Sequence, residues 1–170
     1  VLARELSEKE IERITAKSPI ETEVFCHGAM CMAYSGQCYM SAIVGERSGN
    51  RGRCAQPCRL PYGNGYELSL KDMSLLRYVD RLEQMGVASL KIEGRMKGAE
   101  YVGAVTRAYA DAKRGKRFEK RDEEYLAGIF SRDGFSDGYF TGKIGEKMFG
   151  VRGLTTNSFP LKNAEYKRAT

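Results

Sequence analysis

The sequence predicts an α/β protein that forms the C-terminal part of a (β/α)8 TIM-like barrel with a long cysteine-bearing insertion. Strand and helix patterns alternate along the chain, which is typical of parallel βα units. Only three such strands are visible in 170 residues, whereas a complete (β/α)8 barrel needs about 250 residues. The first residue, Val1, stands inside a strand-like pattern with no leading turn. We therefore expect a fragment of a longer chain.

The first three elements are expected to be a strand, a helix and a second strand. Residues 1–6 (VLAREL) have the pattern of a short strand. Ser7 and Glu10 form a capping box ahead of apolar positions, which predicts a helix over residues 7–17. Residues 19–27 (PIETEVFCH) alternate polar and apolar side chains and predict the second strand.

The next segment, residues 28–66, has no sustained hydrophobic period and is punctuated by glycine and proline. A run this long without regular structure is uncommon inside a compact domain. Apolar packing alone does not account for its order. We expect a metal bound by its cysteines to organise it.

Regular patterns return after residue 66. Asp72 is expected to cap a helix that ends at Gly86. Its expected apolar face consists of Leu75, Leu76, Val79 and Leu82. Residues 87–94 (VASLKIEG) predict a strand, 99–115 a second amphipathic helix and 122–130 a shorter one. We place the barrel portion at 1–130 and treat 131–170 as an extension or a linker toward a further domain.

The composition indicates a soluble, cytoplasmic protein without a membrane partner. No stretch of about 18 uncharged apolar residues exists, and the first residues alternate too closely with charge for a signal peptide. Lys and Arg number 28 against 22 Asp and Glu, for a net charge of +6. This balance is compatible with an RNA partner and equally with an enzyme that has a solvated basic face. Disulfides are uncommon in the cytosol.

Four of the five cysteines lie close together, with the spacing Cys31-x6-Cys38-x15-Cys54-x3-Cys58. Structural zinc sites usually combine two pairs of the form C-x2-4-C, and only the second pair comes close to that form. An iron-sulfur cluster is larger than one ion and tolerates wider ligand spacing. The spacing therefore favours a cluster, with zinc and with unrelated structural or redox-active thiols as alternatives.

Candidate catalytic residues stand at expected carboxyl ends of strands, where barrel enzymes keep their working groups. His27, the only histidine, is either a general base or a buried imidazole that bonds to the backbone. Glu93 and Arg95 follow the strand 87–94. Arg95 could hold the carboxylates of an anionic co-substrate, beside Glu93 as a base. A structural ion pair that closes the strand is the alternative.

Two basic groups have two interpretations each. Arg47, Arg51, Arg53 and Arg59 lie beside the cysteines and either meet RNA phosphates or balance the negative charge of a thiolate-bound cluster. The run KRGKRFEKR, residues 113–121, is better interpreted as a solvated helix end, where cations suit the helix dipole, than as a second RNA contact.

The stretch EVFCHGAMCMAYSGQCYMS, residues 23–41, resembles the signature of the U32 peptidase family of collagenase-like proteases. The resemblance rests on Glu23, Phe25, Gly28, Ala29, Met30, Cys31, Gly36, Cys38 and Ser41. GNRGRCAQPCRLPY and SLKIEGRMK also resemble family segments, so the similarity covers about residues 1–150.

This resemblance implies two possible activities. Some relatives carry the label of metal-dependent peptidases acting on peptides or collagen-like substrates. Others are implicated in oxygen-independent hydroxylation of a base in tRNA or rRNA, with prephenate as the oxygen source, or of the ubiquinone ring. The hydroxylating relatives hold a 4Fe-4S cluster on four cysteines, which the resemblance assigns here to Cys31, Cys38, Cys54 and Cys58. Cys26 is then an extra thiol.

The residues favour the hydroxylase over the peptidase. No H-E-x-x-H motif is present for a metallopeptidase, and AYSGQ lacks the pattern of a nucleophile elbow. A cluster enzyme acting on RNA finds four thiolates, a basic surface and strand-end residues. We expect an iron-sulfur-dependent RNA hydroxylase. A U32 peptidase is the first alternative, and a module that binds RNA or a partner without catalysis is the second.

Overall fold

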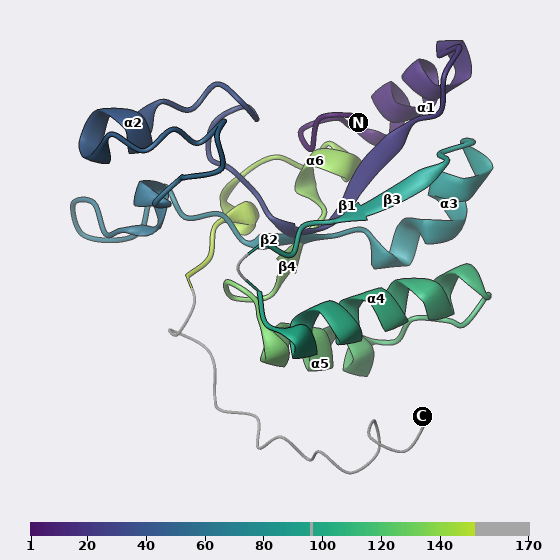
Figure 1. Ribbon diagram of the computed structural model, residues 1–170. Coiled ribbons are helices and arrows are strands. Elements are labelled where there is room, and N and C mark those ends of the chain that lie inside the picture. The colour runs from purple at the N-terminus through teal and green to yellow at the C-terminus, as the bar shows by residue number, and fades with distance from the viewer. Residues whose placement is uncertain (96, 152–170) are drawn as a thin grey trace.

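The computed structural model describes residues 1–95 and 97–151, and it confirms the α/β class. Four strands form one sheet in the order β3-β1-β2-β4 (Figure 1). Their bounds are β1 Glu23–Ala29, β2 Asp72–Ser74, β3 Ser89–Ile92 and β4 Phe135–Ser136. The pairs β1/β3 and β2/β4 are parallel, whereas β1/β2 is antiparallel. The strands expected at residues 19–27 and 87–94 are β1 and β3, and their parallel pairing is as expected, whereas β2 was not expected as a strand and pairs antiparallel to β1.

The helices surround this sheet, and α4 and α5 lie side by side along one of its faces (Figure 1). Their buried face includes Tyr101, Val105, Tyr109 and Leu126. In chain order the helices are α1 Glu8–Lys17, α2 Met40–Gly45, α3 Val79–Gln84, α4 Ala99–Lys113, α5 Lys120–Ile129 and α6 Gly138–Thr141, with 3-10 turns η1 Pro57–Arg59, η2 Leu76–Tyr78 and η3 Glu146–Met148. No helix in the described part of the chain is long and apolar enough to cross a membrane.

The expected capping box of α1 is present. The backbone N–H of Ser7 donates to the Glu10 carboxylate at 2.8 Å, and the Ser7 hydroxyl donates to it at 2.6 Å. These bonds satisfy groups that the first helical turn leaves unpaired.

One expected element is absent, and the helix expected from Asp72 to Gly86 begins later, as η2 and α3. Residues 1–6 form no strand, because only the N–H of Leu2 reaches the sheet, at 2.8 Å from the Glu23 carbonyl, before the chain turns. Asp72 does not cap a helix. It is a buried residue of β2, and its carboxylate bonds to Arg132 instead. The expected apolar face nevertheless is buried, at Leu75, Leu76, Val79 and Leu82.

The core extends beyond the expected boundary at residue 130. Residues 131–151 supply β4, α6 and η3, and Phe140 and Met148 from this part are buried in the common core. The rest of the expected extension, residues 152–170, lies outside the described residues. The sheet described here has four strands, so the barrel remains a prediction.

The carboxyl ends of β1 and β3 meet closely, and Gly28 makes this possible. Its φ of 113° is unfavourable for a residue with a side chain. A Cβ atom there would also lie 2.5 Å from the Glu93 carbonyl oxygen. The Glu93 N–H donates to the His27 carbonyl at 2.8 Å. Glycine therefore brings the end of β3 against β1, directly before the cysteine segment.

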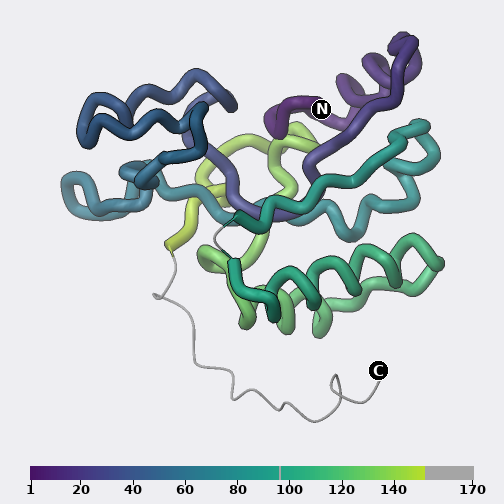
Figure 2. Tube along the Cα trace, in the orientation of Figure 1, coloured from purple at the N-terminus to yellow at the C-terminus, as the bar shows by residue number. Residues whose placement is uncertain are grey.

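The cysteine segment, residues 28–66, projects to one side of the sheet and carries only α2, η1 and turns (Figure 2). The sparse regular structure matches the expectation from its lack of period. The segment begins within β1 and returns to the sheet at β2. Its position places the cysteines beside the carboxyl end of β1.

Candidate functional site

The four clustered cysteines come from four points of the segment. Cys31 follows the end of β1, Cys38 precedes α2, Cys54 precedes η1 and Cys58 lies within η1. The first three are exposed and Cys58 is half-buried. All five cysteines of the chain are free thiols in the structure, so it forms no disulfide framework.

The clustered thiols influence one another electrostatically. Burial raises the pKa of Cys31, the Arg4 guanidinium lowers it, and the thiolates of Cys58 and Cys54 raise it. Burial also raises the pKa of Cys58, and the charges of Cys54 and Cys38 add to that rise. Every one of the four is therefore within electrostatic range of another.

The four sulfur atoms are not gathered tightly. Among the residues that the structure describes, no three His, Cys, Asp or Glu side chains are grouped as one metal ion would require. A zinc ion holds its sulfur ligands at about 2.3 Å. The thiols are thus not arranged as the ligands of a single ion in the described structure.

Two cross-links hold the cysteine segment in shape. The buried Ser41 hydroxyl accepts the N–H of Ala55 at 2.9 Å, and this bond joins the part beyond Cys38 to the part beyond Cys54. The Arg59 guanidinium donates to the carbonyl oxygens of Met30 and of Leu70, the latter at 2.6 Å. Arg59, next to Cys58, therefore joins the point where the chain leaves the sheet to the point where it returns.

Glu93 and Arg95 lie at the sheet end as expected. The Glu93 carboxylate pairs with Arg4 at 3.1 Å and accepts the backbone N–H of Arg95 at 3.0 Å. The Arg95 side chain is exposed and extends against Gly52, where an added methyl group would overlap its guanidinium. Arg95 thereby connects the end of β3 to the cysteine segment.

His27 is enclosed by aromatic rings and is only 1% exposed. Its ring centroid lies 4.9 Å from that of Phe135 and 5.7 Å from that of Tyr109. Nδ1 is 3.4 Å from the Tyr109 hydroxyl, and Nε2 has no hydrogen-bond partner among the described residues. Burial lowers the pKa of His27 from 6.5 to about 4. Contact with a substrate would require these rings to move, so a role as general base remains a prediction.

Cys26 is separate from the other thiols. It is fully buried, and its thiol donates to the Lys91 carbonyl at 3.3 Å. Burial raises the pKa of Cys26 to about 12. A thiol held neutral in this way is a poor nucleophile and a poor metal ligand.

The sequence interpretation missed a buried ion pair below the cysteine segment. The Asp72 carboxylate accepts the backbone N–H of Arg132 at 2.9 Å and also bonds to its guanidinium. The other arm of that guanidinium donates to the side-chain oxygen of Gln56 at 3.1 Å, between Cys54 and Cys58. No local pattern reveals this pair, because its two members belong to distant parts of the chain.

The outer face of the cysteine segment carries exposed aromatic and aliphatic side chains. Tyr34 is 70% exposed and Tyr39 is 66% exposed. Ile43 and Val44 on α2 are exposed as well. Residues 28–66 contain four arginines and only one acidic residue, Glu46. The segment therefore carries a net positive charge and exposed rings.

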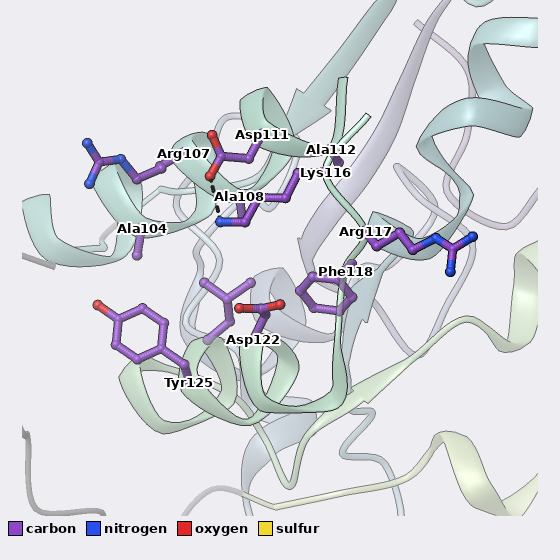
Figure 3. A pocket seen from close by; sticks show the side chains of 11 residues that line it. Ala104, Arg107, Ala108, Asp111, Ala112, Lys116, Arg117, Phe118, Asp122 and Tyr125 are labelled. Atoms are coloured by element: carbon purple, nitrogen blue, oxygen red, sulfur yellow. Dashed lines mark hydrogen bonds and ion pairs between the residues drawn. The ribbon is translucent and has the colours of Figure 1, made fainter. Parts of the chain in front are cut away.

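Two cavities of the described structure lie away from the cysteines. One of about 30 Å³ lies between α4 and α5, where Lys116 pairs with Asp111 at 3.2 Å (Figure 3). Its volume suits a water molecule. A second, of about 230 Å³, is lined by charged groups that pair with each other, such as Arg77 with Glu123. Neither cavity includes a cysteine.

Comparisons with known proteins complete the description of the chain. The family model for peptidase family U32 matches residues 1–149. A collagenase of Porphyromonas gingivalis is 40% identical over 147 residues, which cover 75% of this chain and 40% of that protein. The tRNA hydroxylation protein P of Escherichia coli is 31% identical over 201 aligned positions, covering 82% of this chain and 44% of the relative.

A third relative is also named for RNA hydroxylation. The 23S rRNA 5-hydroxycytidine synthase of Escherichia coli is 46% identical over 120 residues, which are 64% of this chain and 18% of the relative. The chain thus spans less than half the length of each of these three relatives. No solved structure matches it.

Proposed function

Because the chain belongs to peptidase family U32, we propose that it is part of an iron-sulfur-dependent, oxygen-independent hydroxylase that modifies a base in tRNA or rRNA. The observation that carries this proposal is the set of four free thiols on one segment, each within electrostatic range of at least one other. The six residues between Cys31 and Cys38 fit the usual C-x2-4-C zinc pair poorly, and this spacing favours a 4Fe-4S cluster over zinc.

In this proposal Cys31, Cys38, Cys54 and Cys58 hold the cluster, which would supply one-electron redox chemistry when bound. The chain provides cations for the negative charge of the thiolates. Arg4 acts on Cys31, and Arg59 acts on both Cys31 and Cys58. Arg132 adds a third positive charge near Cys58. These guanidiniums lower the pKa of both thiols against the larger rise that burial causes, and so favour the thiolate that metal binding requires.

The strand-end residues are proposed to bind the co-substrate. Arg95 is exposed beside the cysteine segment, and a guanidinium binds carboxylates in bidentate fashion. An anion with two carboxylates, such as prephenate, suits such a group. Glu93 is held by Arg4 and by the Arg95 backbone, so it orients the Arg95 segment and stands next to the bound anion as a candidate base. Substitution Arg95→Glu is expected to abolish co-substrate binding and to leave the iron content unchanged.

The outer face of the cysteine segment is proposed to bind the RNA. Tyr34 and Tyr39 present exposed rings on which unpaired bases can stack. Arg51 and Arg53 are exposed on the same segment, where they can contact phosphates. Both kinds of group lie within a few residues of the cysteines in sequence, so a bound base would be held near the proposed reaction centre.

The first experiment measures iron, zinc and acid-labile sulfide after anaerobic purification of the full-length protein and of its Cys54→Ala variant. About four irons per chain, lost in the variant, are the expected result. Mass spectrometry of tRNA and rRNA nucleosides from cells lacking the protein should then show loss of one hydroxylated base. One zinc per chain, or no metal after reconstitution, would refute the hydroxylase proposal.

Proteolysis is the second candidate function, because the relative from Porphyromonas gingivalis is named a collagenase. Gelatin cleavage by the full-length protein, unaffected by the Cys54→Ala change, would favour it. Retention of RNA affinity by a variant lacking all four clustered cysteines, without either activity, would instead indicate a binding module.

A further inference from the structure

Gln56 has an unusual backbone conformation at the centre of the Cys54-x3-Cys58 pair. Its φ of 58° and ψ of 48° place it in the left-handed region, which residues with a side chain rarely adopt. In this conformation its N–H donates to the Cys54 sulfur at 3.2 Å. Its carbonyl accepts the N–H of Arg59 at 2.9 Å and thereby starts the turn that carries Cys58. The backbone of one residue thus sets the relative position of two cysteines.

A tertiary contact holds Gln56 in place. Its side-chain oxygen accepts a hydrogen bond from Arg132 Nη2 at 3.1 Å. Arg132 is only 7% exposed, and its second arm and its backbone N–H both bond to Asp72. Asp72 belongs to β2 in the middle of the sheet and is 2% exposed. The Arg132 guanidinium therefore connects the sheet to the residue between the two cysteines.

The chemistry of a buried ion pair supports a role in positioning. Such a pair contributes little net stability compared with apolar residues of the same volume, because both charges lose their hydration. The ion pair instead fixes the direction in which the Arg132 guanidinium points. The planar guanidinium can serve Asp72 and Gln56 at the same time, whereas a lysine ammonium lacks this fork.

We propose that Gln56 is a positioning residue for the Cys54–Cys58 pair and that the Asp72–Arg132 ion pair is its anchor. The inference rests on the proposed function where it concerns the cluster. The Asp72–Arg132–Gln56 contacts, here called the relay, would place two of the four ligands and orient an N–H group toward one ligand sulfur. The same relay also orders residues 54–59 in the chain without a cluster, so it can be tested independently.

The test compares four variants with the unaltered chain. Gln56→Ala removes the side-chain acceptor, and Gln56→Glu keeps an acceptor oxygen at the same place. Arg132→Lys keeps the buried positive charge and removes the fork. Gln37→Ala, the same kind of change at an exposed position of the same segment, is the matched control.

The first measurement is amide hydrogen exchange over residues 54–59 in the chain without metal. We expect exchange about tenfold faster in Gln56→Ala and Arg132→Lys, since losing a hydrogen bond to a charged group is worth at least that factor. Gln56→Glu and the control should match the unaltered chain. Equal exchange in Gln56→Ala and Gln56→Glu would overturn the inference, and this pair suffices if Arg132→Lys fails to fold.

The second measurement uses the reconstituted chain and follows the reduction potential and the rate of iron release to a chelator. Gln56→Ala should shift the potential, because the N–H donor to the Cys54 sulfur is displaced, and should release iron faster. An unchanged potential with faster amide exchange would overturn the role toward the cluster. If the unaltered chain takes up no cluster, the proposed function fails, while the exchange measurement still decides whether Gln56 positions the two cysteines.

Discussion

The burial of the single histidine predicts a measurable dependence of stability on pH. His27 titrates at about 4 in the folded chain, against 6.5 for an unconstrained histidine. Between these two values the unfolded chain binds a proton that the folded chain does not bind. The free energy of unfolding therefore rises with pH in this window. The stability that the neutral His27 contributes is lost as the pH falls from 6.5 toward 4.

The size of the effect follows from the two pKa values. The full difference corresponds to about 3 kcal/mol, since one pKa unit is worth 1.36 kcal/mol. Between pH 7 and pH 5 the histidine should account for a loss of about 2 kcal/mol. The neighbouring hydroxyls of Tyr101 and Tyr109 do not titrate in this range, because burial raises the pKa of each.

Two assays check this prediction. The chain has one histidine, so proton NMR shows a single imidazole Hε1 signal, and this signal should not move between pH 8 and pH 5. Urea unfolding of the unaltered chain and of His27→Gln at pH 7 and pH 5 isolates the histidine contribution from that of the carboxylates. An NMR midpoint near 6.5, or the same pH dependence in both proteins, would refute the reasoning and would restore His27 as an accessible base.

Three further predictions concern the strand end, the extra thiol and the RNA face. Gly28→Ala should lower the free energy of unfolding by about 2 kcal/mol or more, because it combines a positive φ with a clash against backbone. Gly103→Ala in α4, with open space around it, should raise the free energy of unfolding by about 0.5 kcal/mol. Thermal unfolding ranks the two variants, and equal values would contradict the close approach of β1 and β3 at Gly28. Cys26→Ala should retain the full iron content while costing about 1 kcal/mol of stability, measured by metal analysis and urea unfolding; loss of iron would make this thiol a ligand. Tyr34→Ala should weaken RNA binding about fivefold or more without changing its salt dependence. Arg51→Gln should reduce the slope of log affinity against log salt concentration by about 0.7, as titrations at several salt concentrations would reveal. Unchanged affinity in both variants would show that RNA does not bind this face.

Local signals in the sequence predicted local features well. The capping box of α1 and the amphipathic face of α4 depend on residues a few positions apart, and the structure contains both. The irregular character of residues 28–66 followed from the lack of period and the many glycines. Local signals gave the wrong element for Asp72. A carboxylate before an apolar run resembles a helix cap, and only the distant Arg132 makes it a buried strand residue.

The candidate site divides in the same way. Spacing and resemblance singled out the four cysteines, and the structure places them within electrostatic range of one another. The side chains that hold them could not be identified, since Ser41, Gln56 and Arg132 act through contacts made in three dimensions. The burial of His27 was one of two alternatives that the sequence left open, because position at a strand end does not reveal which side of the sheet is enclosed.

The contacts of Arg59 have a consequence for how the chain could change over evolutionary time. One guanidinium bonds to the carbonyl oxygens of Met30, where the chain leaves the sheet, and of Leu70, where it returns. The two ends of this long loop are therefore neighbours, and the entropic cost of closing a loop grows only with the logarithm of its length. Insertions and deletions between these ends change little in the sheet itself. The same sheet could thus carry a different loop between these two positions, and with it a different chemistry.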